Sequence, residues 1–256
     1  MAQFDRPTIA SRAGSAVAID EGLRSYMLRV YNYMGIGLVV TGLVAWFAAS
    51  SAITNDPSAA AGQLRDGTLV TQWGALIYAS PLQWVVMLAP LAFVMVLSFG
   101  IQRLSVPAAQ GAFWAFAAVM GLSLSSIFLV YTGASIARVF FITAATFGAM
   151  SLFGYTTKRD LTGMGHFLMM GLIGIVIASI VNIFLASSGL QFAISIIGVL
   201  VFVGLTAYDT QKIKESYSEA YGADVLAKNA IMGALSLYLD FVNLFTMLLH
   251  LFGNRE

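Results

Sequence analysis

The chain has 256 residues, of which 59% are hydrophobic and only 10% are charged, and its mean hydropathy is +0.84. Soluble domains carry about 25% charged residues, so this composition excludes an ordinary soluble domain and indicates an integral membrane protein built from spanning helices. The net charge of +1 gives no reason to expect a nucleic-acid partner, and the absence of cysteine excludes disulfides and thiolate metal sites.

The first 28 residues predict a cytoplasmic tail that precedes a membrane domain of residues 29–256. They combine Gly, Ser and Ala with charges of both signs, and a short helix is expected to begin at Glu21. The first apolar run starts near Tyr33 and lasts about 20 residues, a length that fits a spanning helix better than a signal-peptide core.

Seven windows are apolar and long enough to cross about 30 Å of hydrocarbon at 1.5 Å of rise per residue. The fold class is therefore predicted to be all-α, an integral membrane protein with seven transmembrane helices. An alternative has six spans and one re-entrant segment. The long first loop, residues 54–81, predicts a short interfacial helix from Trp73 to Tyr78. The seven windows are residues 31–53, 82–102, 108–131, 136–156, 166–186, 191–212 and 228–252.

Basic residues are unevenly distributed between the two ends of the predicted spans, ten at one end and three at the other. Because Lys and Arg accumulate in cytoplasmic loops, we predict a cytoplasmic N-terminus and, after seven crossings, a C-terminus outside. The inner set is Arg6, Arg12, Arg24, Arg29, Arg103, Lys158, Arg159, Lys212, Lys214 and Lys228, and the outer set is Arg65, Arg138 and Arg255.

Glycines recur inside the predicted spans. Since no hydrophobic effect draws helices together in lipid, small residues allow the close approach that gives dispersion contacts. We therefore interpret these glycines as packing positions, for example Gly35, Gly37, Gly42, Gly171 and Gly174.

Polar residues in the last span are spaced four, three, four, three, four and three residues apart, so they share one helix face. An ionised group at membrane depth costs about 2.5 to 3.5 kcal/mol on insertion scales. This face is therefore expected to look into protein, with the C-terminal helix central in the bundle. Asp240 is predicted to be functional, and Ser236 and Asn243 either support it or form a hydrogen-bonded packing seam. The stripe is Asn229, Gly233, Ser236, Asp240, Asn243, Met247 and His250.

A second acid, Asp209, lies near the cytoplasmic end of the sixth span and is followed by Lys212 and Lys214. Its position alone fits a functional acid and a solvated interfacial charge equally well. Arg103, at the cytoplasmic end of the second span, offers a countercharge to either aspartate.

Contact between Asp209 and Asp240 would give specific chemistry. Two carboxylates within hydrogen-bonding range in a medium of low dielectric constant cannot both ionise cheaply, so the pair would share a proton and sense pH. Loss of that proton leaves hard anionic oxygens, the ligands that Ca²⁺ favours. Both aspartates are therefore expected calcium ligands, and acidity and calcium should compete.

Depth is an obstacle to this contact. Asp209 lies three residues from Lys212, and Asp240 lies twelve residues from Lys228. If the two lysines mark the same membrane surface, the two acids differ in depth by nine residues, or about 13 Å. Contact requires either that the sixth helix continues well past Lys214, for which residues 210–217 are suitable, or that the seventh helix begins outside the hydrocarbon.

Three segments together resemble the Bax inhibitor-1 family, also called the transmembrane Bax inhibitor motif family, and the likeness runs from about residue 24 to the end. The chain looks like a bacterial member, which implies a multi-pass protein of the inner membrane. The segments are Gly154-Tyr-Thr-Thr-Lys-Arg-Asp-Leu161, Thr206-Ala-Tyr-Asp-Thr-Gln-Lys-Ile-Lys214 and Ala234-Leu-Ser-Leu-Tyr-Leu-Asp-Phe-Val-Asn-Leu-Phe245.

The resemblance implies a pH-sensitive calcium leak with the C-terminal helix surrounded by the other six. By motif, Asp209 and Asp240 match the family's sensor pair, and Arg103 is the best match for an arginine that latches the closed form. The chain departs from some relatives in having Ala92 where an acid stands about three turns before that arginine.

An alternative function, also implied by the resemblance, is binding and restraint of a membrane AAA protease in quality control.

An intramembrane aspartyl protease is disfavoured, because Leu237-Tyr-Leu-Asp240 lacks the Gly-x-Gly-Asp half of that signature. No Lys lies in the middle of a span to hold retinal, and His166 and His250 are expected on opposite sides of the membrane, which argues against a zinc site. We expect no catalytic residue and no cofactor. The expected partners are membrane lipid, protons and calcium as the transported ion.

Overall fold

The computed structural model describes residues 9–63 and 67–254, with side chains described from Glu21 onward. Its elements are α1 (Ile9–Ala52), η1 (Pro57–Ala59), β1 (Gly62–Gln63), β2 (Leu69–Val70), α2 (Gln72–Tyr78), α3 (Leu82–Gly100), α4 (Val106–Leu124), α5 (Ile127–Val130), α6 (Gly133–Thr156), α7 (Thr162–Leu185), α8 (Ser188–Glu215) and α9 (Ala223–Phe252).

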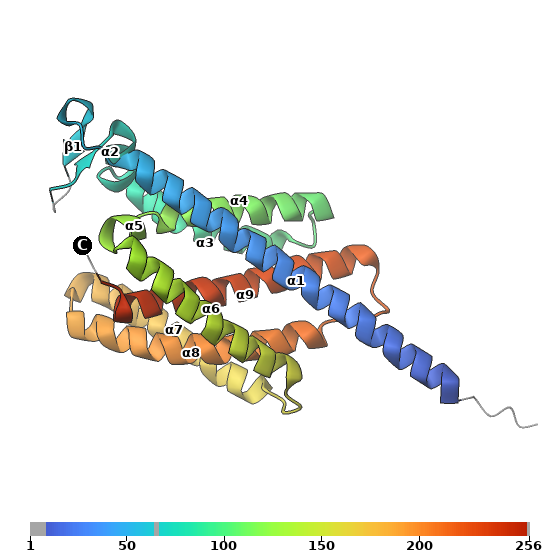
Figure 1. The fold of residues 1–256 in the computed structure, drawn as a ribbon. Coiled ribbons are helices and arrows are strands. Elements are labelled where there is room, and N and C mark those ends of the chain that lie inside the picture. The colour runs from blue at the N-terminus through green and yellow to red at the C-terminus, as the bar shows by residue number, and fades with distance from the viewer. Residues whose placement is uncertain (1–8, 64–66, 255–256) are drawn as a thin grey trace, which may run out of the picture.

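Seven helices in the described residues are long and apolar enough to cross a membrane, which confirms the predicted fold class. One span, residues 106–130, consists of α4 and α5 and is interrupted at Ser125 and Ser126. The interfacial helix of the first loop is present as α2, whereas the antiparallel pair β1 and β2 in the same loop was not predicted. The described chain begins at one end of the bundle and finishes at the other, as an odd number of crossings requires (Figure 1).

The predicted boundary at residue 28 does not coincide with a break in the structure. A single helix, α1, runs from Ile9 to Ala52, so the short separate helix expected from Glu21 is part of the first span. Tyr26 and Met27 are buried in the hydrophobic core. The packed domain therefore includes residues that the sequence reading assigned to the tail, and residues 1–8 of that tail lie outside the described part.

The C-terminal helix α9 is the centre of the bundle. It packs against α1, α4, α6 and α8 (Figure 1), and it is the most buried of the seven spans. Helix α3 packs on α4, and α7 packs on α8. The expectation of a surrounded last helix is confirmed, with four helices forming its main neighbours and two helices lying outside these.

Neighbouring side chains of α9 face different helices. The Tyr238 hydroxyl lies 2.6 Å from the Thr41 hydroxyl of α1, and its ring meets Phe116 of α4 edge-on at a centroid distance of 5.2 Å. Phe241 packs its ring against Phe140 and Phe147 of α6, both at 5.5 Å. These contacts fix the rotation of α9 about its axis. They therefore also fix the direction of the Asp240 side chain, since Asp240 lies between Tyr238 and Phe241 in the sequence.

The glycines divide into packed and open positions. A Cβ on Gly37 or Gly171 would lie 3.1 Å from a side chain of another helix, which agrees with the packing interpretation. A Cβ on Gly35, Gly42 or Gly174 would meet nothing within 4 Å, so the packing interpretation is wrong for these three. Gly35 and Gly42 instead line cavities between helices.

Gly154→Ala is expected to destabilise the protein by about 1 to 3 kcal/mol. An added Cβ would collide with the carbonyl oxygen of Ala207, a backbone atom that cannot move aside without shifting α8. Gly148→Ala in the same helix is the matched control, because nothing lies within 4 Å of its Cβ and Ala favours a helix. Thermal unfolding in detergent measures both, and equal midpoints would contradict the close contact between α6 and α8.

The predicted orientation can be tested with single cysteines, since the chain contains none of its own. Ala59 in η1 and Ala220 between α8 and α9 are exposed. The connection from α1 to α2 and the connection from α8 to α9 lie at opposite ends of the bundle (Figure 1). With a cytoplasmic N-terminus, a membrane-impermeant maleimide should label Ala59→Cys in intact spheroplasts and Ala220→Cys only after permeabilisation. The reverse pattern would overturn the prediction.

Candidate functional site

The candidate site lies where α8 and α9 pack antiparallel to each other. A Cβ on Gly233 of α9 would lie 3.1 Å from Ile213, and a Cβ on Gly198 of α8 would lie 2.9 Å from Met247. Ile213 thus lies opposite Gly233. Asp209 is four residues before Ile213 on α8, which on the antiparallel α9 corresponds to a position four residues after Gly233, and Asp240 is seven residues after Gly233. The two aspartates are therefore offset by three residues, about 4.5 Å of helix rise, a separation that their side chains can bridge.

The two carboxyl groups meet within the seam between α8 and α9. The two side chains are close enough to act directly on each other. Asp240 is buried, with 5% of its surface exposed, and Asp209 is partly buried. The Oδ2 atom of Asp240 is buried without a hydrogen-bond partner among the described residues. A buried, under-satisfied carboxyl group is costly, which marks this contact as the strongest functional candidate.

The depth obstacle is resolved by the start of α9 rather than by a longer α8. Helix α8 ends at Glu215, two residues before the end of the stretch that was expected to extend it. Helix α9 begins at Ala223, ten residues before Gly233, whereas only two residues of α8 follow Ile213. At 1.5 Å per residue, α9 therefore extends about 12 Å past the end of α8 (Figure 1).

Arg103 lies away from the aspartate pair. It is exposed, just after α3, and its neighbour Gln102 accepts a hydrogen bond from the Lys228 ammonium at 3.3 Å. Lys228 precedes Asp240 by twelve residues on α9, about 18 Å of rise. The cation that is close enough to attract Asp209 is Lys212, one turn further along α8.

The polar stripe of α9 faces α8. Gly233, Asp240 and Met247 all contact residues of α8, and Ser236 lies between the first two in sequence. The Asn243 amide donates to the Leu239 carbonyl oxygen of its own helix at 2.8 Å. Among the described residues, the hydrogen bond of the Asn243 amide therefore lies within α9, whereas a packing seam would need one between helices.

The pair supplies oxygen ligands of the type that calcium prefers, but few of them. Calcium takes six to eight oxygen ligands, and the two carboxyl groups provide four oxygens. Among the described residues, no group of three or more His, Cys, Asp or Glu could hold a metal ion.

The turn of α8 that carries Asp209 also anchors the loop between α6 and α7. The Gln211 amide accepts from Leu161 N and donates to the Arg159 carbonyl oxygen, both at 2.8 Å. The Lys214 ammonium donates to the Tyr155 carbonyl oxygen at 2.8 Å. Two of the three sequence motifs are thus in direct contact.

Sequence reasoning missed a hydroxyl chain beside the site. Tyr31 of α1, Ser151 of α6 and Thr210 of α8 are linked by hydrogen bonds of 2.6 Å and 3.0 Å, and Thr210 donates to the Thr206 carbonyl oxygen at 2.7 Å. Hydroxyl residues commonly bond to their own helix in spans, so nothing in the sequence distinguishes these three. Their role depends on which helices are neighbours.

Known proteins match this chain over nearly its whole length. A family model described as "Inhibitor of apoptosis-promoting Bax1" matches residues 23–256, so the match begins within the buried part of α1. The inner membrane protein YbhL of Escherichia coli K12 is 50% identical over 247 residues, which are 96% of this chain and 98% of that protein.

Two uncharacterized proteins are also similar over nearly their full length. The one from Caulobacter vibrioides is 47% identical over 99% of this chain and 97% of its own. The one from Rickettsia prowazekii is 48% identical over 93% of this chain and 92% of its own. With its seven spanning helices and the family match over residues 23–256, the chain belongs to the Bax inhibitor-1 family of membrane proteins.

Proposed function

We propose that the chain is a pH-sensitive, calcium-permeable leak of the inner membrane, gated by protonation of the Asp209–Asp240 pair. The observation that carries the proposal is the contact of two carboxyl groups from adjacent helices, one of them almost fully buried. Two such groups cannot both ionise cheaply in a medium of low dielectric constant, so the packed seam holds one shared proton.

Loss of the shared proton supplies the energy for opening. Two unit charges about 4 Å apart repel by about 4 kcal/mol at an effective dielectric constant of about 20. Since about 1.4 kcal/mol is tenfold in an equilibrium constant, this repulsion can shift a two-state equilibrium by nearly three orders of magnitude. The deprotonated pair would push α8 from α9 and offer anionic oxygens to Ca²⁺.

A small apolar cavity on the side of α9 that faces α1 and α6 supports a pore that runs along α9. It has a volume of about 110 Å³ and lies between α1, α5, α6 and α9. Phe140, Phe241 and Phe245 line it, and their rings pack edge to face. An apolar constriction of this kind excludes water and ions until the helices separate, so we assign the present arrangement to the closed, protonated state.

In the present conformation Arg103 does not reach the aspartate pair, so the latch expected of it would form only in another conformation. Arg103 lies at the Lys228 end of the bundle, so a direct latch requires the end of α3 to move toward the pair. Lys212 is the basic residue that acts on Asp209 in the closed arrangement.

An alternative function, restraint of a membrane AAA protease, is favoured by one feature of the fold. The N-terminal end of α1 extends beyond the other helices at that end of the bundle (Figure 1). A projecting helix is available to a partner without disturbing the packed domain.

Asp240→Asn is expected to abolish the pH dependence of calcium entry into vesicles between pH 6 and 8. Wild-type protein should admit more calcium as pH rises, because deprotonation charges the pair. Asn keeps the shape of Asp but carries no proton to release. Asp224→Asn is the matched control, because Asp224 is an exposed residue in the first turn of the same helix. An unchanged pH profile for Asp240→Asn would remove the sensor role.

Deletion of residues 2–20 distinguishes the two functions. If the chain restrains a protease, the truncated protein should lose co-purification with the membrane AAA protease while keeping its thermal stability. If it is a leak, calcium entry and its pH dependence should survive the deletion. Retained co-purification would argue against the projecting helix as the binding element.

A further inference from the structure

A groove runs between α1 and α6, along the stretch of α1 from Arg24 to Gly35. Its volume is about 780 Å³, and its lining includes Arg24, Tyr31 and Gly35 of α1 and Gly148, Ser151 and Tyr155 of α6. Phe147 and Met34 in its floor are buried against the core, whereas Leu28 and Leu152 along its sides are 52% and 63% exposed. The groove is therefore apolar and open sideways, toward the lipid.

The depth of the groove matches one leaflet of a bilayer. Arg24 and Gly35 are eleven residues apart on α1, about 16 Å of rise, which is close to half of a hydrocarbon core about 30 Å thick. A Cβ on Gly35 or Gly148 would meet nothing within 4 Å. The two glycines leave the inner half of the groove wide enough for a chain of methylene groups.

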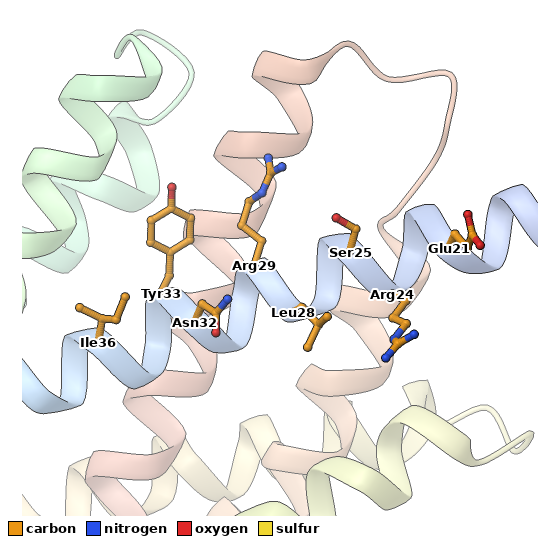
Figure 2. A pocket seen from close by; sticks show the side chains of 8 residues that line it. All are labelled: Glu21, Arg24, Ser25, Leu28, Arg29, Asn32, Tyr33 and Ile36. Carbon is orange, nitrogen blue, oxygen red and sulfur yellow. The ribbon is translucent and has the colours of Figure 1, made fainter.

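Positive charge gathers at the open end of the groove. Figure 2 shows the Arg24 and Leu28 side chains pointing away from Arg29, and Arg24 is the charged residue among those that line the groove. Lys214 of α8 contacts Tyr155, a residue of the opposite wall: its ammonium donates to the Tyr155 carbonyl oxygen and lies 5.4 Å from the centre of the Tyr155 ring. Arg24 therefore lies in the lining and Lys214 lies behind Tyr155, and the described lining contains no acid.

The floor of the groove is closed by hydrogen bonds. Tyr31 and Ser151 meet across it at 2.6 Å, and Ser151 continues to Thr210 of α8 at 3.0 Å. Ser151 is 3% exposed. The groove therefore ends at these hydroxyls instead of opening toward α8, so it is a binding surface and not a passage.

We propose that this groove binds an anionic phospholipid, with one acyl chain between Gly35 and Gly148 and the phosphate at Arg24 and Lys214. Basic pockets between spanning helices select anionic headgroups, and an apolar groove that opens to the bilayer takes up a lipid chain. A lipid bound here would contact both α1 and α6 at the level of the hydroxyl chain of Tyr31, Ser151 and Thr210. The last of these residues directly follows Asp209 in the sequence. The inference does not depend on calcium transport.

Native mass spectrometry of the full chain in detergent tests the proposal, with dioleoyl phosphatidylglycerol and dioleoyl phosphatidylcholine as probes. Wild-type protein should bind phosphatidylglycerol preferentially. Arg24→Gln should reduce that binding about fivefold, the effect of one basic residue near a membrane surface. Arg29→Gln is the matched control, since Arg29 lies on the same helix and points to the other side (Figure 2). Equal losses for the two variants would overturn the site in favour of diffuse surface charge.

A second variant tests the acyl chain. Gly148→Leu should fill the groove and weaken binding of both lipids, whereas Gly111→Leu, at another open glycine on α4, should not. Thermal unfolding establishes that both variants are folded. If folded Gly148→Leu bound phosphatidylglycerol as strongly as the wild-type protein does, the proposal would be overturned. A wild-type dimer that Gly148→Leu dissociates would also overturn it, because a second copy would then occupy the groove.

Discussion

The polar face of α9 is the constraint on which the rest of the bundle depends. A helix that carries Asp240 cannot turn this face to lipid, because no water is present there to solvate it. The bundle meets the constraint by surrounding α9 with α1, α4, α6 and α8. Helices α3 and α7, each with 11% of its most apolar 18-residue window buried, take the outer positions.

The turn of α8 that carries Asp209 connects three parts of the protein. Asp209 faces α9, Thr210 bonds to α6, and Gln211 holds the loop between α6 and α7. Because these residues are consecutive on one rigid helix, a displacement of α8 at the aspartate pair must also strain the bonds to α6 and to the loop. The proposed gate and the loop at the end of the bundle are therefore mechanically linked.

The open glycines show how a helical bundle can use small residues for space as well as for contact. Gly154 and Gly233 allow backbones to approach closely, and both lie at contacts with α8. Gly35 and Gly148 have open space around them and face a groove. The residue type is the same in both cases, and only the distance to the neighbouring helix separates the two uses.

The sequence by itself determined the seven spans, the helix that must be central and the acids worth examining, because hydropathy, helical spacing and the cost of burying charge act locally. It also determined the family, through three motifs whose contacts the fold then explains. Only the tertiary structure decided that Asp209 and Asp240 meet, because their relative depth depends on where α9 begins and on the contacts of Ile213 with Gly233 and Gly198 with Met247. It also placed Arg103 apart from the pair and joined Tyr31, Ser151 and Thr210. Such pairings depend on which helices are neighbours and on their register, and neither quantity is encoded in the periodicity of a single segment.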